Sequence, residues 1–282
     1  MTDPTDRSRF RFYPCYLLQD NEIPFAVWFE DALGYYGVST VVFDLYLLVD
    51  DIEVAAQALV RNGWSIVPYD ASKINVGFDS KAHRRLLPPP DPDAADKARV
   101  AAQTWPLGPR PPPPPSNRPS PPTTTILLPA TDWNYKLPEV TKDATAVASF
   151  IPPLPDLLDA LIDSFLDCEP SMFFSHLSCQ VGYLYGYVTE LRQASFAENL
   201  KYEHRQFHLD WLSGMSVGTV PFAQHERKIR DALREGKNEI QPCSAPRTDR
   251  KLFNQAEQAE VHAAMQQNNL TRNSRDRSSG GF

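Results

Sequence analysis

The sequence predicts a protein of the α/β (α+β) class, with a small mixed sheet and a helical C-terminal region. Short apolar segments alternate with helical patterns over residues 9–85, whereas residues 151–240 carry helical patterns alone. A chain of 282 residues that is 42% hydrophobic is also long enough to bury a sizeable core. We therefore expect a sheet with helices on its faces and the helical region packed beside it.

The first elements are expected to be a strand, a helix and a second strand. Residues 10–18 alternate aromatic and polar side chains, as a strand does. Pro24 is placed to open a helix with a broad apolar face, and Gly37 is placed to end that helix. The run 38–49 is β-branched and almost continuously apolar, which is typical of a central strand covered on both faces.

A second helix and two further strands complete the expected sheet. Asp50 and Asp51 put negative charge at the first turn of a helix over residues 52–62, where the helix dipole favours it. Residues 64–68 predict a strand that returns beside the first strand by a crossover. Residues 125–128 predict another core strand.

Proline is concentrated between the two parts of the predicted sheet. Residues 86–122 hold proline tracts for which polyproline II is the only regular conformation. We expect this segment to be a disordered insert, with the core sheet continuing over residues 123–150. The insert could bind a protein partner with an aromatic-lined groove or act as a spacer, and both interpretations stay open. The largely polar residues 255–282 predict a disordered tail.

The helical region is expected to hold four main helices. Apolar side chains recur at helical spacing in four segments, residues 156–166, 175–187, 193–212 and 221–235. His204 and His208 lie four residues apart in the third segment, a spacing that zinc sites use. Apolar neighbours and the lack of further ligands favour structural roles for both histidines.

Composition and charge exclude several classes of protein. A formal net charge of -7 argues against general nucleic-acid binding, which needs clustered Lys and Arg. The N-terminus carries no secretory leader pattern, and the longest apolar run is too short to span a bilayer, so no membrane partner is expected. The 4 cysteines form no C-x-x-C pair and are expected to be reduced. A cytoplasmic, or nuclear, location is expected.

One block of the chain carries a fold-level resemblance. In residues 28–64 a small helix ending at Gly37 leads into the strand Val-Val-Phe-Asp-Leu-Tyr-Leu-Leu-Val. This arrangement resembles a minimal nucleotidyltransferase core. It is also similar to uncharacterised fungal proteins that share the Phe-Asp-Leu-Tyr-Leu-Leu-Val strand and the segment His-Glu-Arg-Lys-Ile-Arg-Asp-Ala-Leu. The resemblance implies a sheet of nucleotidyltransferase type, in which paired carboxylates hold divalent ions against nucleotide phosphates.

Asp44 is the carboxylate that the resemblance places on the central strand. Alternation puts Asp44 and Tyr46 on one face, so a tyrosine stands where the second carboxylate is expected. Asp132, which follows the strand after the insert, is the candidate for the missing partner. Together Asp44 and Asp132 would be the catalytic residues and would hold Mg²⁺. The structural alternative is a buried Asp44 bonded to the backbone or to Tyr46.

A second candidate site lies on the last predicted helix. Arg227, Arg230 and Arg234 share one face, where three guanidinium groups could hold a nucleotide phosphate. Acidic residues interleave with them at pairing distances, so a salt-bridged face is the alternative. We expect Asp44, Asp132 and this face to meet in a cleft between the sheet and the helices.

These observations favour a nucleotidyltransferase-like protein that has lost catalysis and binds a nucleotide or a protein partner. This interpretation depends on Tyr46, which stands at the position where metal-dependent nucleotidyl transfer needs a carboxylate. Two alternatives stay open. One is an active, divergent metal-dependent nucleotidyltransferase that uses Asp44 and Asp132, and the other is an adaptor recognised through its proline-rich insert.

Overall fold

The strands that the structure describes form one mixed sheet. A computed structural model describes residues 11–68, 83–90, 123–139, 147–214 and 218–244. The strands are β1 (Phe25–Trp28), β2 (Leu45–Val49), β3 (Ser65–Ile66), β4 (Arg84–Leu87) and β5 (Thr125–Pro129). They pair in the order β1-β2-β5-β4-β3. The β2–β5 pair is parallel, and the other three pairs are antiparallel. The predicted α/β class with a mixed sheet is confirmed.

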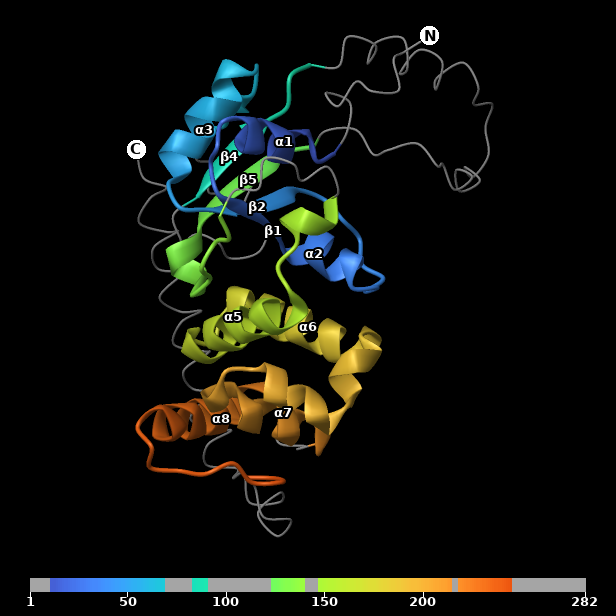
Figure 1. Cartoon of the computed structure of the whole chain (residues 1–282), viewed down its shortest axis with the longest axis vertical. Helices are drawn as coiled ribbons and strands as arrows, with labels where there is room; N and C mark the ends of the chain where they lie inside the picture. Colours follow the sequence, from blue (N-terminus) through green and yellow to red (C-terminus); the bar gives the residue numbers. More distant parts are fainter. Residues whose placement is uncertain (1–10, 69–82, 91–122, 140–146, 215–217, 245–282) are drawn as a thin grey trace, which may run out of the picture.

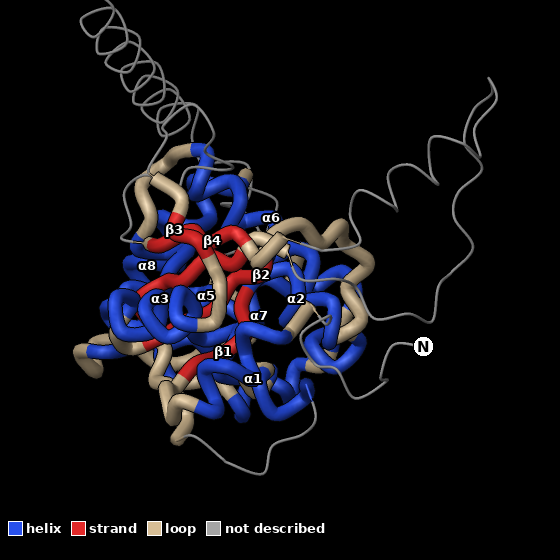
Figure 2. The backbone as a smooth tube through the Cα atoms, turned by 90° about the horizontal axis from the view of Figure 1, so that it is seen from above, coloured by secondary structure: helices blue, strands red, loops and turns tan. Residues whose placement is uncertain are grey.

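Helices cover both faces of the sheet and extend well beyond it. They are α1 (Tyr13–Asp20), α2 (Phe29–Tyr35), α3 (Ile52–Arg61), α5 (Leu154–Asp167), α6 (Met172–Tyr187), α7 (Arg205–Leu212) and α8 (Thr219–Arg234). Figure 1 shows α1 and α3 on one side of the sheet, α5 and α6 on the other side, and α7 and α8 beyond them. Figure 2 shows the strands grouped together, with helices around them. Helix α5 is therefore an interior layer.

The centre of the sheet is the parallel pair β2 and β5. Leu45 lies opposite Thr125 and Val49 lies opposite Pro129, and every residue of β2 is buried. Burial on both faces explains why this strand is apolar throughout and why β5 was predictable from its sequence. The predicted strand 38–49 is confirmed only in its last part, because residues 38–44 precede β2 in an irregular segment.

The first predicted strand is wrong, because residues 13–20 form helix α1. Pro14 lies in the first turn of this helix, a position that suits a residue without an N–H donor. Every residue from Pro14 to Gln19 is buried. With no exposed face in this stretch, alternation of residue types could not distinguish a strand from a helix.

The single helix predicted to begin at Pro24 is instead a strand followed by a short helix. β1 pairs with β2, with Phe25 opposite Val49 and Trp28 opposite Tyr46. The chain then turns at Phe29, whose φ of 50° is rare for a bulky residue, and continues as α2. The predicted end of this helix is confirmed, because Gly37 follows α2 with a φ of 88°.

Strand β4, which lies next to the edge strand β3, was not predicted from the sequence. β4 pairs with both β5 and β3, so β3 forms the edge of the sheet and does not lie beside a first strand. Leu86, at which the predicted insert begins, is fully buried in β4. Residues 91–122 of the predicted insert, and the predicted tail 255–282, lie outside the described residues.

Three of the four predicted C-terminal helices are present, as α5, α6 and α8. The segment 193–212 is not one helix: two 3₁₀ helices, η7 (Ala194–Asn199) and η8 (Tyr202–His204), precede α7. The break occurs where the N–H of Lys201 donates to the Asp159 carboxylate at 3.1 Å instead of to a helical carbonyl. Among the helices of the described residues, none combines the length and the apolar character that crossing a membrane requires.

Helix α3 gives a direct test of the local structure. Asp51 caps α3 by accepting hydrogen bonds from the N–H groups of Glu53 and Val54, at 2.9 and 3.0 Å. We predict that Asp51→Ala lowers the free energy of unfolding by about 1 kcal/mol, because these N–H groups lose their acceptor. Asp50→Ala is the matched control, since Asp50 is exposed and lies outside the cap. Urea denaturation followed by circular dichroism measures both, and equal losses would contradict the capping role.

Candidate functional site

The two carboxylates predicted to share a metal ion lie at opposite ends of the central strand pair. Asp44 immediately precedes β2, whereas Asp132 lies in the 3₁₀ helix η4 (Ala130–Trp133) that follows β5. Because β2 and β5 are parallel and in register, the start of one strand is far from the end of the other. The paired segment alone spans about 13 Å, at about 3.3 Å per residue. The structure therefore does not bring Asp44 and Asp132 together.

Asp44 is held in an ion pair instead of facing open solvent. Arg85 Nη2, from β4, donates to Asp44 Oδ2 at 3.1 Å. Burial raises the pKa of Asp44, although the charges of Arg85 and Arg11 act in the opposite direction. A guanidinium group thus occupies the position that a divalent ion would need. Magnesium binding by Asp44 stays a prediction that would require Arg85 to move.

A second arginine fixes the segment around Asp44. Arg11 forms a bidentate ion pair with Asp31 of α2, with both N···O distances at 2.7 Å. The same guanidinium donates to the carbonyl oxygens of Phe43 and Asp44, at 3.1 and 2.9 Å. Bidentate geometry of this kind restricts both partners. Arg11 therefore ties α2 to the entry of β2.

Polar side chains from α2, β2, β4 and α6 meet around the ion pair of Arg85 and Asp44. We call them the Glu30–Asp44 cluster, which comprises Glu30, Asp44, Tyr46, Arg85, His176 and Gln180. Gln180 Nε2 donates to Glu30 Oε1 at 3.4 Å and lies 3.3 Å from His176 Nε2. Burial raises the pKa of Tyr46, and the charges of Glu30 and Asp44 raise it further. Perturbed ionisable groups gathered in one place are typical of functional sites.

Two further groups of the cluster have shifted pKa values, and two of its oxygen atoms are unsatisfied. Burial raises the pKa of Glu30, and burial lowers the pKa of His176 to about 4, so this histidine is neutral near pH 7. Among the described residues, Glu30 Oε2 and Gln180 Oε1 are buried without a hydrogen-bond partner. Such atoms are uncommon in folded proteins and indicate either strain or a ligand that supplies donors.

The backbone beneath the cluster is strained. Phe29, which precedes Glu30, has a φ of 50°, a conformation that costs a bulky residue about 1–3 kcal/mol. Its ring packs against Tyr46, His176 and Trp133, with centroid distances of 5.2, 5.1 and 5.0 Å. These ring contacts hold the strained turn in place. This arrangement fixes the position of the first turn of α2, which carries Glu30 and Asp31.

The sequence contained only part of the signal for this cluster. Asp44 was found from its place on the predicted central strand. His176 and Gln180 come from α6, and Gln180 is 150 residues away from Glu30 along the chain. Arg85 comes from the strand that was not predicted. No local pattern connects these positions.

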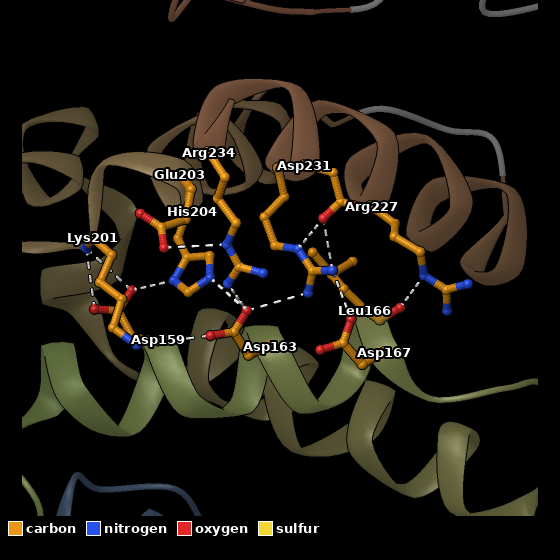
Figure 3. Close-up of polar contacts among 11 residues, drawn as sticks. Asp159, Asp163, Leu166, Asp167, Lys201, Glu203, His204, Arg227, Asp231 and Arg234 are labelled. Atoms are coloured by element: carbon orange, nitrogen blue, oxygen red, sulfur yellow. Dashed lines mark hydrogen bonds and ion pairs between the residues drawn. The ribbon is translucent and has the colours of Figure 1, made fainter. Parts of the chain in front are cut away.

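The arginine face of α8 lies in a different part of the molecule. Arg230 donates to Asp163 and Asp167 of α5, at 3.2 and 2.6 Å. Arg234 donates to Asp163 at 2.6 Å and to Glu203 at 3.3 Å. Figure 3 shows Arg227 and Arg234 extending from α8 towards Leu166 and Asp163 of α5.

Arg227, the third arginine of this face, also forms hydrogen bonds with α5. Arg227 donates to the carbonyl oxygens of Leu166 and Cys168, at the C-terminal end of that helix. Cations at this end of a helix are favoured by its dipole. Because α5 lies between α8 and the sheet (Figure 1), the structure does not bring Asp44 and the arginine face together as predicted. The salt-bridged alternative describes these three residues.

His204 completes the ion-pair network. Its Nδ1 lies 2.6 Å from Asp159 Oδ1, and its Nε2 lies 3.0 Å from Asp163 Oδ1. His208 instead lies 2.9 Å from the Tyr185 hydroxyl through Nδ1, and 3.0 Å from a carbonyl oxygen through Nε2. The two histidines therefore point to different partners and make structural contacts. We call Asp159, Asp163, His204, Arg230 and Arg234 the Asp163 network.

The pKa values of the network follow from its charges. Burial alone would lower the pKa of His204, but the hydrogen bonds and charges of Asp159 and Asp163 outweigh burial and raise it. Burial alone would raise the pKa of Asp163, but His204, Arg234 and Lys201 outweigh burial and hold this pKa below its usual range. Both shifts favour the charged forms of His204 and Asp163.

A further group of possible metal ligands lies where α7 meets α8. Asp210, His225 and Glu226 place their ligand atoms within 4.8 Å of one another, and no other set of three does so among the described residues. Burial raises the pKa of Glu226 to about 10, and the neighbouring Asp210 adds to this shift. This group was not recognised in the sequence, because its members come from two helices.

Comparisons with protein-family models, with curated proteins and with solved structures find no match to the chain.

Removing the charge of Asp163 should destabilise the protein strongly. We predict that Asp163→Asn lowers the free energy of unfolding by about 3–5 kcal/mol, because His204 and two arginines lose a buried counter-charge. Asp156→Asn is the matched control on the same helix, since Asp156 is exposed, and should cost less than about 1 kcal/mol. Urea denaturation measures both variants. Similar losses in the two would show that the network contributes little.

The network should also make stability depend on pH. The raised pKa of His204 gives stability that is complete below about pH 6.5 and is lost as pH rises through its folded-state pKa. The lowered pKa of Asp163 gives stability that is complete above about pH 4 and is lost as pH falls further.

We therefore predict that the wild-type protein loses more stability than His204→Gln between about pH 6 and pH 9. Chemical denaturation of both proteins across this range measures the difference in slope, which does not depend on how stable the variant is at any one pH. Parallel curves would show that His204 is not charged in the folded protein.

Proposed function

We propose that the chain is a nucleotidyltransferase-like protein that has lost metal-dependent transfer and binds a nucleotide at the Glu30–Asp44 cluster. The observation that carries this proposal is the ion pair between Arg85 and Asp44, with a distance of 3.1 Å. The arginine neutralises the one carboxylate that the resemblance assigns to a metal ion. Tyr46 replaces the second carboxylate, and Asp132 lies at the far end of the strand pair.

The chemistry of the cluster favours the base of a nucleotide over its phosphates. Glu30 and Asp44 would repel a triphosphate, whereas the unsatisfied oxygens Glu30 Oε2 and Gln180 Oε1 need hydrogen-bond donors. A guanine base offers an N–H and an amino group side by side, which are donors of the kind that these two oxygens lack.

Calorimetric titration with nucleosides tests the proposal. We predict that guanosine binds without Mg²⁺ and that inosine, which lacks the amino group, binds about tenfold more weakly. Inorganic tripolyphosphate should give no binding heat. Absence of binding by guanosine, GMP and GTP would remove the nucleotide part of the proposal.

A matched pair of variants locates the binding site. Glu30→Gln should weaken guanosine binding by about tenfold or more, because a charge-assisted hydrogen bond is lost. Glu190→Gln changes an exposed glutamate and should leave the affinity unchanged. Equal effects in both variants would place the ligand elsewhere.

The active-enzyme alternative makes the opposite prediction. If the chain transfers nucleotides, turnover of a nucleoside triphosphate should require Mg²⁺ and be lost in Asp44→Asn without loss of folding. Such a result would overturn the proposal of lost catalysis. We expect no turnover in the wild-type protein.

The adaptor alternative also has one supporting observation. Val41 and Phe43 are 65% and 69% exposed, and the Thr123 hydroxyl, where the chain returns from residues 91–122, donates to the Phe43 carbonyl oxygen at 3.1 Å. Apolar side chains therefore lie on the surface beside the point where the proline-rich segment ends. Capture of a protein partner that is lost when residues 91–122 are deleted would support this alternative.

We include an intracellular location, cytoplasmic or nuclear, in the proposal. None of the 4 described cysteines, Cys15, Cys168, Cys179 and Cys243, forms a disulfide bond. Reduced thiols are typical of proteins in reducing compartments.

A further inference from the structure

The group formed by Asp210, His225 and Glu226 combines two carboxyl groups with an imidazole inside the protein. Asp210 and Glu226 are 0% and 1% exposed, and the His225 side chain is 21% exposed. Their ligand atoms lie within 4.8 Å of one another. Burying two carboxyl groups side by side is costly unless a cation or hydrogen-bond donors compensate.

Hydrogen bonding in this group is incomplete. Asp210 accepts from the N–H and the hydroxyl of Ser244, at 2.7 and 2.5 Å. Glu226 Oε1 has no hydrogen-bond partner among the described residues, although it is buried and lies 4.0 Å from His225 Nε2. A buried acceptor in this position fits a missing cation.

The Ser244 hydroxyl marks the centre of the group. It lies 2.7 Å from His225 Nε2 and 2.5 Å from Asp210 Oδ2, so one oxygen atom contacts two of the three candidate ligands. The donors around this point are therefore one imidazole nitrogen and carboxylate oxygens.

We propose that Asp210, His225 and Glu226 bind a divalent transition-metal ion, with Zn²⁺ as the best match. An imidazole with carboxylates suits Zn²⁺, whereas Mg²⁺ and Ca²⁺ require six or more oxygen ligands. In a tetrahedral site with bonds of about 2.0–2.3 Å, the ligand atoms lie roughly 3.3–3.8 Å apart. The present group would thus contract by ~1 Å as the Ser244 hydroxyl moves aside.

The site would have a structural effect on the C-terminal end of the described chain. Asp210 belongs to α7, and His225 and Glu226 belong to α8. A bound ion would join these two helices through three side chains. This inference does not depend on the proposed nucleotide site, because none of its residues belongs to the Glu30–Asp44 cluster.

Metal titration of the full chain tests the proposal. Protein dialysed against EDTA is titrated with ZnCl₂ by calorimetry, and we expect one Zn²⁺ per chain and a rise in thermal unfolding temperature on binding. Co²⁺ serves as a spectroscopic probe, and visible absorption bands of a bound Co²⁺ ion that are lost in His225→Gln would identify the imidazole ligand.

Glu226→Gln is the variant that separates metal binding from folding. The amide is close in shape to the carboxyl group and needs no counter-charge, so the apo protein should unfold at the same temperature or a higher one. We expect its affinity for Zn²⁺ to fall at least tenfold, and His225→Gln to show a similar loss. His83→Gln is the control at a histidine outside the site and should bind Zn²⁺ as the wild type does. Unchanged affinity in Glu226→Gln and His225→Gln, or no Zn²⁺ binding by the wild type, would overturn the proposal.

Discussion

The Asp163 carboxylate accepts hydrogen bonds from Arg230 and Arg234 and lies 3.0 Å from the ring of His204. It is 3% exposed, so these contacts replace water around a buried charge. Helix α5 is an interior layer, with the sheet on one side and α8 on the other. It can be one only because its buried carboxylates pair with cationic side chains on the side of α8. Removing one partner would leave the remaining charges without compensation in a medium where that is costly.

This network also decides which functions the helical half can have. A row of arginines on one helix is compatible with phosphate binding when the row is free, but here each arginine donates to α5. The sheet half is different, since Glu30 and Gln180 retain buried oxygens without donors among the described residues. The structure thus separates a satisfied ionic network, which stabilises, from an unsatisfied polar cluster, which is the better candidate for ligand binding. The group at His225 is a second unsatisfied cluster.

Much of the fold could be predicted from local patterns, and the errors have physical causes. Helix α3 was found because Asp51 and the apolar face of residues 52–61 are local signals. Strand β5 was found because a strand buried on both faces is apolar throughout. Helix α1 was mistaken for a strand because almost all of it is buried. Strand β4 was missed because it begins with two arginines, which are not typical of a buried strand. One of them, Arg85, pairs with Asp44.

The candidate site was harder to predict than the fold. Asp44 and Tyr46 were identified from their alternation on one strand, but the pairing of Asp44 with Asp132 failed because sequence does not reveal that β2 and β5 are parallel and in register. The partners that the structure shows for Asp44 and Glu30 come from β4 and α6. Contacts between residues so distant along the chain depend on the order of strands and the packing of helices, and no spacing rule encodes them.

The charge state of His204 tests the central claim about the Asp163 network most directly. Nitrogen-15 NMR of the histidine rings near pH 7, with His204 assigned by its absence from the spectrum of His204→Gln, distinguishes an imidazolium ion from either neutral tautomer. The contacts with Asp159 and Asp163 predict that both ring nitrogens carry a proton. A neutral ring at this pH would contradict the account, because one of the two short contacts would then join an acceptor to an acceptor.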